Sequence, residues 1–125
     1  MPVRSIEERL QVKAQRRLAV IDAPPELDEE IGATGARAPL DLADVVLSFA
    51  YDLSDFKSHL SSVLRASRND AILWFAYPKL TSSMASDIHR DIIREMSPKY
   101  GLETVAQIAI DEDWSALRLK RVEKT

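Results

Sequence analysis

The chain has 125 residues, of which 46% are hydrophobic and 30% charged, with a formal net charge of −3 and no cysteine. A chain of this size can bury one core without metals or disulfides, and the lack of cysteine excludes a disulfide framework, a zinc–thiolate site and a thiol nucleophile. No apolar run approaches the ~20 residues that span a bilayer, and the basic N-terminus lacks the apolar stretch of a signal peptide. We therefore expect one domain over 1–125, located in the cytoplasm, with no membrane partner.

The charges are distributed unevenly along the chain. Residues 1–17 hold five basic and two acidic side chains, whereas residues 18–56 hold one basic and nine acidic side chains. A nucleic-acid-binding protein normally presents a basic face or stripe, and the acidic block would repel a phosphate backbone. The sequence predicts no nucleic-acid partner.

The first elements are short. Ser5 and Glu8 have the spacing of a capping box, which predicts a helix over about 5–15 inside an N-terminal helical segment, residues 1–17. The run LAVIDA, residues 18–23, is rich in β-branched residues and predicts a strand that two prolines end.

The next segment, residues 24–42, is predicted to be mostly an irregular acidic connection, with room for one helical turn around Leu27 and Ile31. ADVVLSFAY, residues 43–51, is nearly continuous in apolar residues, as strands covered on both faces are. An amphipathic helix with Asp52 or Ser54 as its cap follows, because apolar residues recur at helical spacing, at Leu53, Phe56, Leu60, Val63 and Leu64.

AILWFAY, residues 71–77, predicts another buried strand, and a polar loop follows it. Apolar residues then recur every four positions, which predicts a helix that begins near Ser86 or Asp87 and ends at Ser97-Pro98. Two further runs, 104–110 and 115–122, are separated by too few residues for a helical crossover, so they must be antiparallel neighbours.

The second of these runs alternates apolar and basic residues, which is typical of an edge or half-exposed strand. Either this strand, 115–122, or the short strand 18–23 could pair with a second copy to form a homo-oligomer, although the charged residues of 115–122 argue against pairing there.

Strands that alternate with helices imply right-handed crossovers and a parallel sheet. The predicted fold is a three-layer, Rossmann-like α/β domain with a mainly parallel sheet of about five strands, ending in an antiparallel C-terminal hairpin. This order resembles that of methyltransferases that use S-adenosylmethionine, with their second and third strands missing. Such folds place glycines directly after the first strand, but here Ala23-Pro24-Pro25 follow it and no G-x-G-x-x-G occurs. We therefore expect no cofactor and no affinity for S-adenosylmethionine.

Open parallel sheets bind ligands beyond the carboxyl ends of their strands. This rule selects a rim for an unknown small molecule or protein partner, formed by Tyr77, Pro78, Lys79, Thr81, Ser82, Ser83, Asp87, Asp111 and Trp114. Lys79 and the hydroxyls next to a helix start could bind an anion, although serine and threonine also simply form turns, and Asp87 could cap that helix in the anion's place. Three acids at one turn are more often a polar turn than a cation site, so we predict no metal.

The same residues resemble a bacterial domain-of-unknown-function family, numbered 3052. Its members read approximately W-x-x-x-P-K-x-[ST]-S, then D-x-x-R-D, then D-x-x-W-S-x-L-[RK], which here run from Trp74, from Asp87 and from Asp111. Leu80 departs from the pattern, because members often have a second lysine there, and this weakens an anion-binding role. The resemblance implies a small cytoplasmic bacterial α/β protein without an established activity.

Two functions stay open. The first is a non-catalytic binding or regulatory module on a degenerate methyltransferase-like fold; the second is a small-molecule or anion-binding enzyme with its site at the strand ends. An enzyme predicts a partly enclosed space between the Lys79 loop and the turn from Asp111 to Trp114, whereas a binding module predicts a flatter rim.

Overall fold

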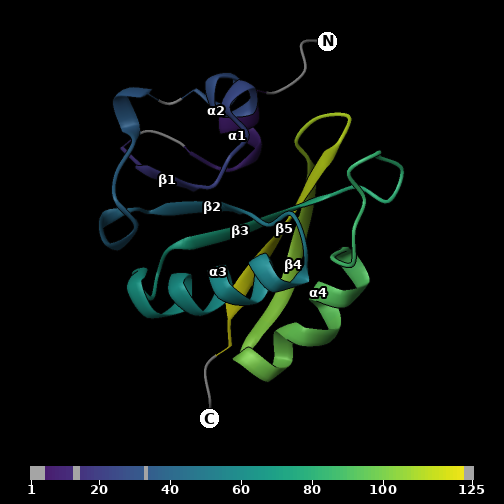
Figure 1. The fold of residues 1–125 in the computed structure, drawn as a ribbon. Helices are drawn as coiled ribbons and strands as arrows, with labels where there is room; N and C mark the ends of the chain where they lie inside the picture. The colour runs from purple at the N-terminus through teal and green to yellow at the C-terminus, as the bar shows by residue number, and fades with distance from the viewer. Residues whose placement is uncertain (1–4, 13–14, 33, 123–125) are drawn as a thin grey trace.

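The fold contains one sheet of five strands. The computed structural model describes residues 5–12, 15–32 and 34–122. The strands lie in the order β1-β2-β3-β5-β4 (Figure 1), with the bounds β1 Leu18–Ile21, β2 Val45–Phe49, β3 Ile72–Pro78, β4 Leu102–Ala109 and β5 Trp114–Arg121.

The sheet is mixed, so the expected mainly parallel sheet is only partly matched. β1, β2 and β3 pair in parallel, whereas β5 is antiparallel to both β3 and β4. β5 is an inner strand, so of the two alternatives predicted for 115–122 the edge strand is wrong, whereas partial exposure is found at Arg118 and Lys120. Leu117 and Leu119 are buried, Arg118 is half-buried and Lys120 is exposed. Successive side chains of a strand point to opposite faces of the sheet. The alternation of apolar and basic residues therefore reflects one sheet face that is less covered around Arg118 and Lys120.

Helices cover both faces of the sheet, which makes three layers (Figure 1). α1 (Ile6–Arg9) and α2 (Pro25–Ile31) lie on one face, and α3 (Leu53–Ala66) and α4 (Arg90–Met96) lie on the other. Each face has its own core. The α1/α2 core includes Leu10, Leu27, Leu47, Trp74 and Trp114, and the α3/α4 core includes Phe56, Leu60, Phe75, Tyr77 and Ile93.

α1 is shorter than the expected helix over 5–15. The Ser5 hydroxyl accepts a hydrogen bond from the backbone N–H of Glu8 at 3.2 Å, as the capping box predicts. Gln11 then adopts a φ of 69°, a left-handed conformation that a helix cannot continue through, so the helix ends before it. Part of the expected segment, at 1–4 and 13–14, lies outside the described residues.

Residues 24–42 are more ordered than an irregular connection. α2 begins at Pro25, where the missing N–H of proline costs nothing because the first helical N–H groups have no partner inside a helix. Leu27 and Ile31 are buried against the sheet, so burial rather than local propensity stabilises this acidic helix.

The two edges of the sheet differ. The outer edge of β1 is partly covered, since Ala38 N–H donates to the Leu18 carbonyl at 3.0 Å. β4 forms the other edge, and β5 lies inside the sheet, where it cannot pair with a second copy of the chain. Among the described residues, no helix is both long and apolar enough to cross a membrane.

Candidate functional site

The segments that follow β1, β2, β3 and β4 meet at one end of the sheet. The first three strands run in parallel, and β4 has the same direction because β5 is antiparallel to both β3 and β4. The loop after β3 and the turn between β4 and β5 are joined directly. Lys79 N–H donates to the Asp113 carbonyl at 2.7 Å, and the Ser82 hydroxyl donates to a carboxylate oxygen of Asp113 at 2.8 Å. These contacts close the gap between the two segments of the predicted rim.

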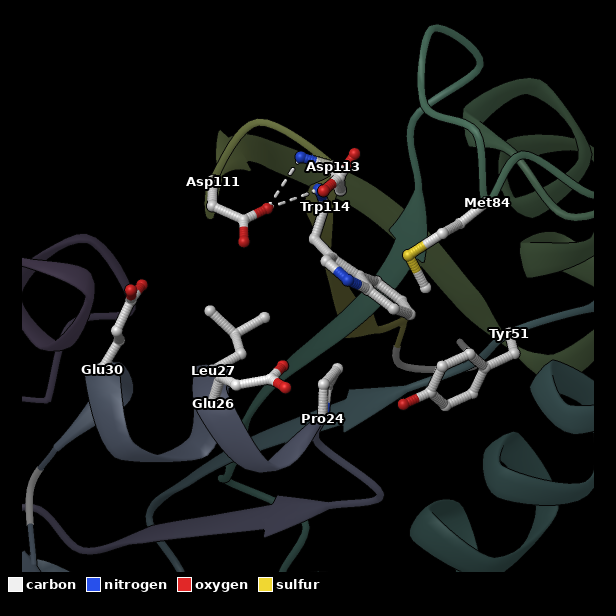
Figure 2. Close-up of a pocket in the computed structure, with 9 residues that line it drawn as sticks. All are labelled: Pro24, Glu26, Leu27, Glu30, Tyr51, Met84, Asp111, Asp113 and Trp114. Atoms are coloured by element: carbon white, nitrogen blue, oxygen red, sulfur yellow. Dashed lines mark hydrogen bonds between the residues drawn. The ribbon is translucent and has the colours of Figure 1, made fainter.

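The carboxylates of Asp111 and Asp113 in this turn accept hydrogen bonds from neighbouring groups. One carboxylate oxygen of Asp111 accepts hydrogen bonds from the backbone N–H groups of Asp113 and Trp114, both at 2.8 Å (Figure 2). With one Asp113 oxygen bonded to Ser82, the turn is a polar turn held by its own side chains.

The predicted rim is divided between the two faces of the sheet. Pro78 pairs with Trp114 across β3 and β5, and Tyr77 pairs with Ser115. Successive side chains alternate in direction, so Trp114 joins the α1/α2 core and Tyr77 joins the α3/α4 core. A separate cavity lies on each side.

We call the first one the Trp114 cavity (Figure 2). It has a volume of about 220 Å³ and is lined by Pro24, Glu26, Leu27, Glu30, Tyr51, Met84, Asp111, Asp113 and Trp114. Trp114 is only 2% exposed and packs edge-on against Phe49 and Tyr51, with ring centroids 5.0 and 5.2 Å away. Burial, followed by the charges of Asp22, Asp55 and Glu26, raises the pKa of Tyr51. The ionisable groups of this lining are thus four carboxyl groups and one neutral phenol.

The second is the Tyr77 cavity, on the α3/α4 face. It has a volume of about 270 Å³ and is lined by Tyr77, Lys79, Leu80, Thr81, His89, Arg90, Asp91, Gln107 and Ser115. Tyr77 is 4% exposed and Ser115 5% exposed, so both hydroxyl groups belong to well-packed residues. Burial raises the pKa of Tyr77, and the charge of Arg90 is the largest effect that opposes this shift.

Asp87 does not start the helix that follows it, which corrects that prediction. α4 begins at Arg90, with His89 as its N-cap. One Asp87 oxygen instead accepts from the backbone N–H of Leu53 at 2.8 Å, at the start of α3, and the Ser86 hydroxyl donates to the Tyr51 carbonyl at 2.6 Å. The end of the loop is therefore hydrogen-bonded to the β2–α3 junction. Because no helix starts at Ser86, the predicted anion site beside such a start is not formed.

The structure brings Tyr77, Lys79 and Thr81 together in one cavity and places Asp111 and Trp114 in the other. Pro78 is buried in β3, and Ser83 is exposed. Gln107, Arg90 and Ser115 line this cavity beside Tyr77, and the sequence did not predict that. The signal available for Ser115 was the strand alternation next to Trp114, which predicts opposite directions for two neighbouring residues.

Solved structures with similar folds are methyltransferase-like and Rossmann-like proteins. A candidate type 11 methyltransferase from Sulfolobus solfataricus superposes with a TM-score of 0.51 at 15% identity, covering 94% of this chain and 77% of the other. The ribosomal protein L11 methylase from Lactobacillus delbrueckii subsp. bulgaricus gives a TM-score of 0.51 at 12% identity, covering 95% and 64%. A protein of the NADB-Rossmann superfamily from Streptococcus agalactiae gives 0.52 at 11% identity, covering 100% and 71%.

These likenesses show the fold alone. LepI, solved as a complex with SAM, also superposes, with a TM-score of 0.50 at 11% identity, and this chain spans 39% of its length. No protein-family model and no curated protein matches the chain. The chain thus has a methyltransferase-like α/β fold.

Proposed function

We propose that this protein is a non-catalytic binding or regulatory module on a methyltransferase-like scaffold, and that it binds its ligand at the carboxyl ends of the strands. In this proposal the sheet of this chain corresponds to a methyltransferase sheet that lacks its second and third strands. Membership of domain-of-unknown-function family 3052 and a bacterial origin belong to the same proposal, since they rest on the spacing of Trp74, Lys79 and Trp114, and so does the cytoplasmic location expected from the sequence.

The observation that supports the proposal most directly is the contact between the loop and the turn. An enzyme with its site between Lys79 and Asp111 would need an enclosed space there. Instead, Lys79 N–H and the Ser82 hydroxyl both bond to Asp113, at 2.7 and 2.8 Å. The space that remains between the loop and the turn, lined by Met84, Asp111 and Trp114, is the Trp114 cavity of about 220 Å³, which is small for a substrate.

The place of a methyl donor, next to the end of the first strand, does not suit S-adenosylmethionine. The methionine part of that molecule carries an ammonium group, which acids can bind, and a carboxylate, which needs N–H donors or basic side chains. Pro24 and Pro25 have no N–H to donate, and the ionisable lining residues of the Trp114 cavity are acids and a tyrosine. The volume of about 220 Å³ also lies below the about 300 to 1,000 Å³ of typical ligand pockets.

Tyr77 is suited to donating a hydrogen bond to a ligand. Burial raises its pKa above the usual value of 10.0, so the phenol stays protonated at neutral pH. A small-molecule or anion-binding enzyme with its site at the strand ends is the second hypothesis.

Isothermal titration calorimetry with S-adenosylmethionine and S-adenosylhomocysteine tests the proposal. We expect no measurable heat of binding with either compound, while the L11 methylase named above serves as the positive control for the ligand preparation. Micromolar affinity of this chain for either compound would refute the proposal, because it would show that the donor site is intact.

A further inference from the structure

The two cavities at the strand ends carry opposite charge. The Trp114 cavity is lined by four carboxyl groups, whereas Lys79 and Arg90 both line the Tyr77 cavity, where Asp91 is the acid. The side chain of Asp91 is 72% exposed and that of Arg90 50% exposed, so water screens both charges, and the lining keeps one more cation than anion because of Lys79. The split arises because the alternation of β5 sends Trp114 and Ser115 to opposite faces.

The cations of the Tyr77 cavity are weakly engaged by the protein itself. Nη1 of Arg90 lies 3.5 Å from the Gln107 side-chain oxygen and Nε lies 3.7 Å from a carboxylate oxygen of Asp91, both at or beyond the limit of a good hydrogen bond. Within the described part of the chain, the Lys79 ammonium makes no ion pair. Both groups are therefore available to a ligand.

Neutral donors complete the lining. The hydroxyls of Tyr77, Thr81 and Ser115 come from β3, from the loop and from β5, so three separate elements contribute to one cavity. A guanidinium, an ammonium and several hydroxyls together form the donor set that proteins use for oxyanions, because charge-assisted hydrogen bonds to such groups are short and strong.

The Tyr77 cavity is a shallow, open hollow of about 270 Å³. That leaves room for one oxyanion group with a short organic part. Leu80, 65% exposed at this cavity, can cover an apolar portion of the ligand.

We infer that the Tyr77 cavity binds the phosphate or carboxylate group of a small molecule, held by Lys79 and Arg90 with the Tyr77, Thr81 and Ser115 hydroxyls. This inference rests on the proposed function and names its ligand class. It differs from an anion site made by the N–H groups of a helix start, because its charge comes from the side chains of Lys79 and Arg90.

The test uses the isotopically labelled full chain and amide NMR spectra. Inorganic phosphate is titrated in one arm and malonate in another, with chloride at equal ionic strength as the reference. We expect saturable shifts of the Lys79, Thr81 and Ser115 amides. Stronger binding of phosphate would indicate a phosphate monoester and stronger binding of malonate a carboxylate, and both results support the inference.

Two double variants make the test specific. Lys79→Met with Arg90→Gln should weaken binding at least about tenfold, since both charged donors are lost. Lys57→Met with Arg65→Gln removes the same charge from exposed positions of α3 and should change affinity less than about twofold. Both variants should melt within about 2 °C of the unmodified protein, because Lys57, Arg65 and Arg90 are exposed and the half-buried Lys79 makes no ion pair among the described residues.

Three results would overturn the inference: equal weakening in both double variants, shifts confined to residues outside the cavity, or no saturable shift up to about 10 mM anion. None of these would bear on the calorimetry with S-adenosylmethionine. A chain that binds neither anion nor methyl donor would still be a module whose ligand is of another class. Affinity for the methyl donor would refute the proposed function even if anions bind.

Discussion

The hydrogen bond between Ser82 and Asp113 decides whether the loop after β3 and the β4–β5 turn behave as one unit. We predict that Ser82→Ala destabilises the protein and that most of the loss is coupled to Asp113. The Ser82 oxygen makes two hydrogen bonds, as donor to Asp113 at 2.8 Å and as acceptor from Met84 N–H at 3.0 Å. Only the first joins the loop to the turn.

The size of the effect follows from the geometry. A hydrogen bond to a charged group contributes about 1.5–3 kcal/mol when it is shielded from water. Ser82 and Asp113 are both half-buried, so solvent competes for the carboxylate, and we expect a coupling free energy of about 1 kcal/mol. For a chain of this size that corresponds to a shift in melting temperature of about 3 °C.

The assay is a double-mutant cycle with Ser82→Ala, Asp113→Ala and the combined variant, measured by urea unfolding. Ser83→Ala is the matched control, since its side chain is exposed, and it should change stability by less than about 0.5 kcal/mol. Hydrogen exchange of the Lys79 amide, which donates to the Asp113 carbonyl, should accelerate in Ser82→Ala. A coupling free energy below about 0.3 kcal/mol would mean that the two residues act independently. That result would refute the idea that the Ser82–Asp113 hydrogen bond joins the loop to the turn.

Two further predictions concern the edges of the site. Asp87→Ala should lower the free energy of unfolding in urea by about 1 kcal/mol, because the Leu53 N–H loses its acceptor at the start of α3. Asp87→Asn keeps an acceptor oxygen and should lose less. Equal losses of stability in the two variants would contradict this role of Asp87. The pKa of Asp44 is lowered, chiefly by the Arg17 N–H and further by Arg68, so its contribution to stability is complete above the unfolded value of 3.8 and is lost as pH falls below it. Unfolding free energies measured between pH 5 and pH 2 should therefore fall less steeply in Asp44→Asn than in the unmodified protein.

Much of the fold could be predicted from local patterns. The run from Val45 to Phe49 is buried at every position, as a strand covered on both faces must be, and Asp52 caps α3 through the Asp55 N–H at 2.8 Å. Gly101 adopts a φ of 72°, a left-handed conformation that glycine takes without strain. These features depend on neighbours in the chain, so the sequence contains the information for them.

The predictions that the structure corrects concern segments whose conformation depends on a contact with a distant part of the chain. The acidic segment after Pro24 forms a helix because Leu27 and Ile31 reach the sheet. The loop continues past Asp87 because its carboxylate binds the start of another helix, at Leu53, 34 residues earlier in the chain. Local propensity does not depend on either contact, so it cannot predict these two segments.

For the candidate site, the sequence by itself determined the end of the sheet and most of the residue types found there, because strand and helix order imply where parallel strands end. Only the tertiary structure decided how those residues are grouped. Tyr77 and Trp114 were expected on one rim, yet the antiparallel entry of β5 between β3 and β4 places them on opposite faces. The physical reason is that a strand's side-chain alternation is local, whereas the register that sets two strands side by side is a property of the whole sheet.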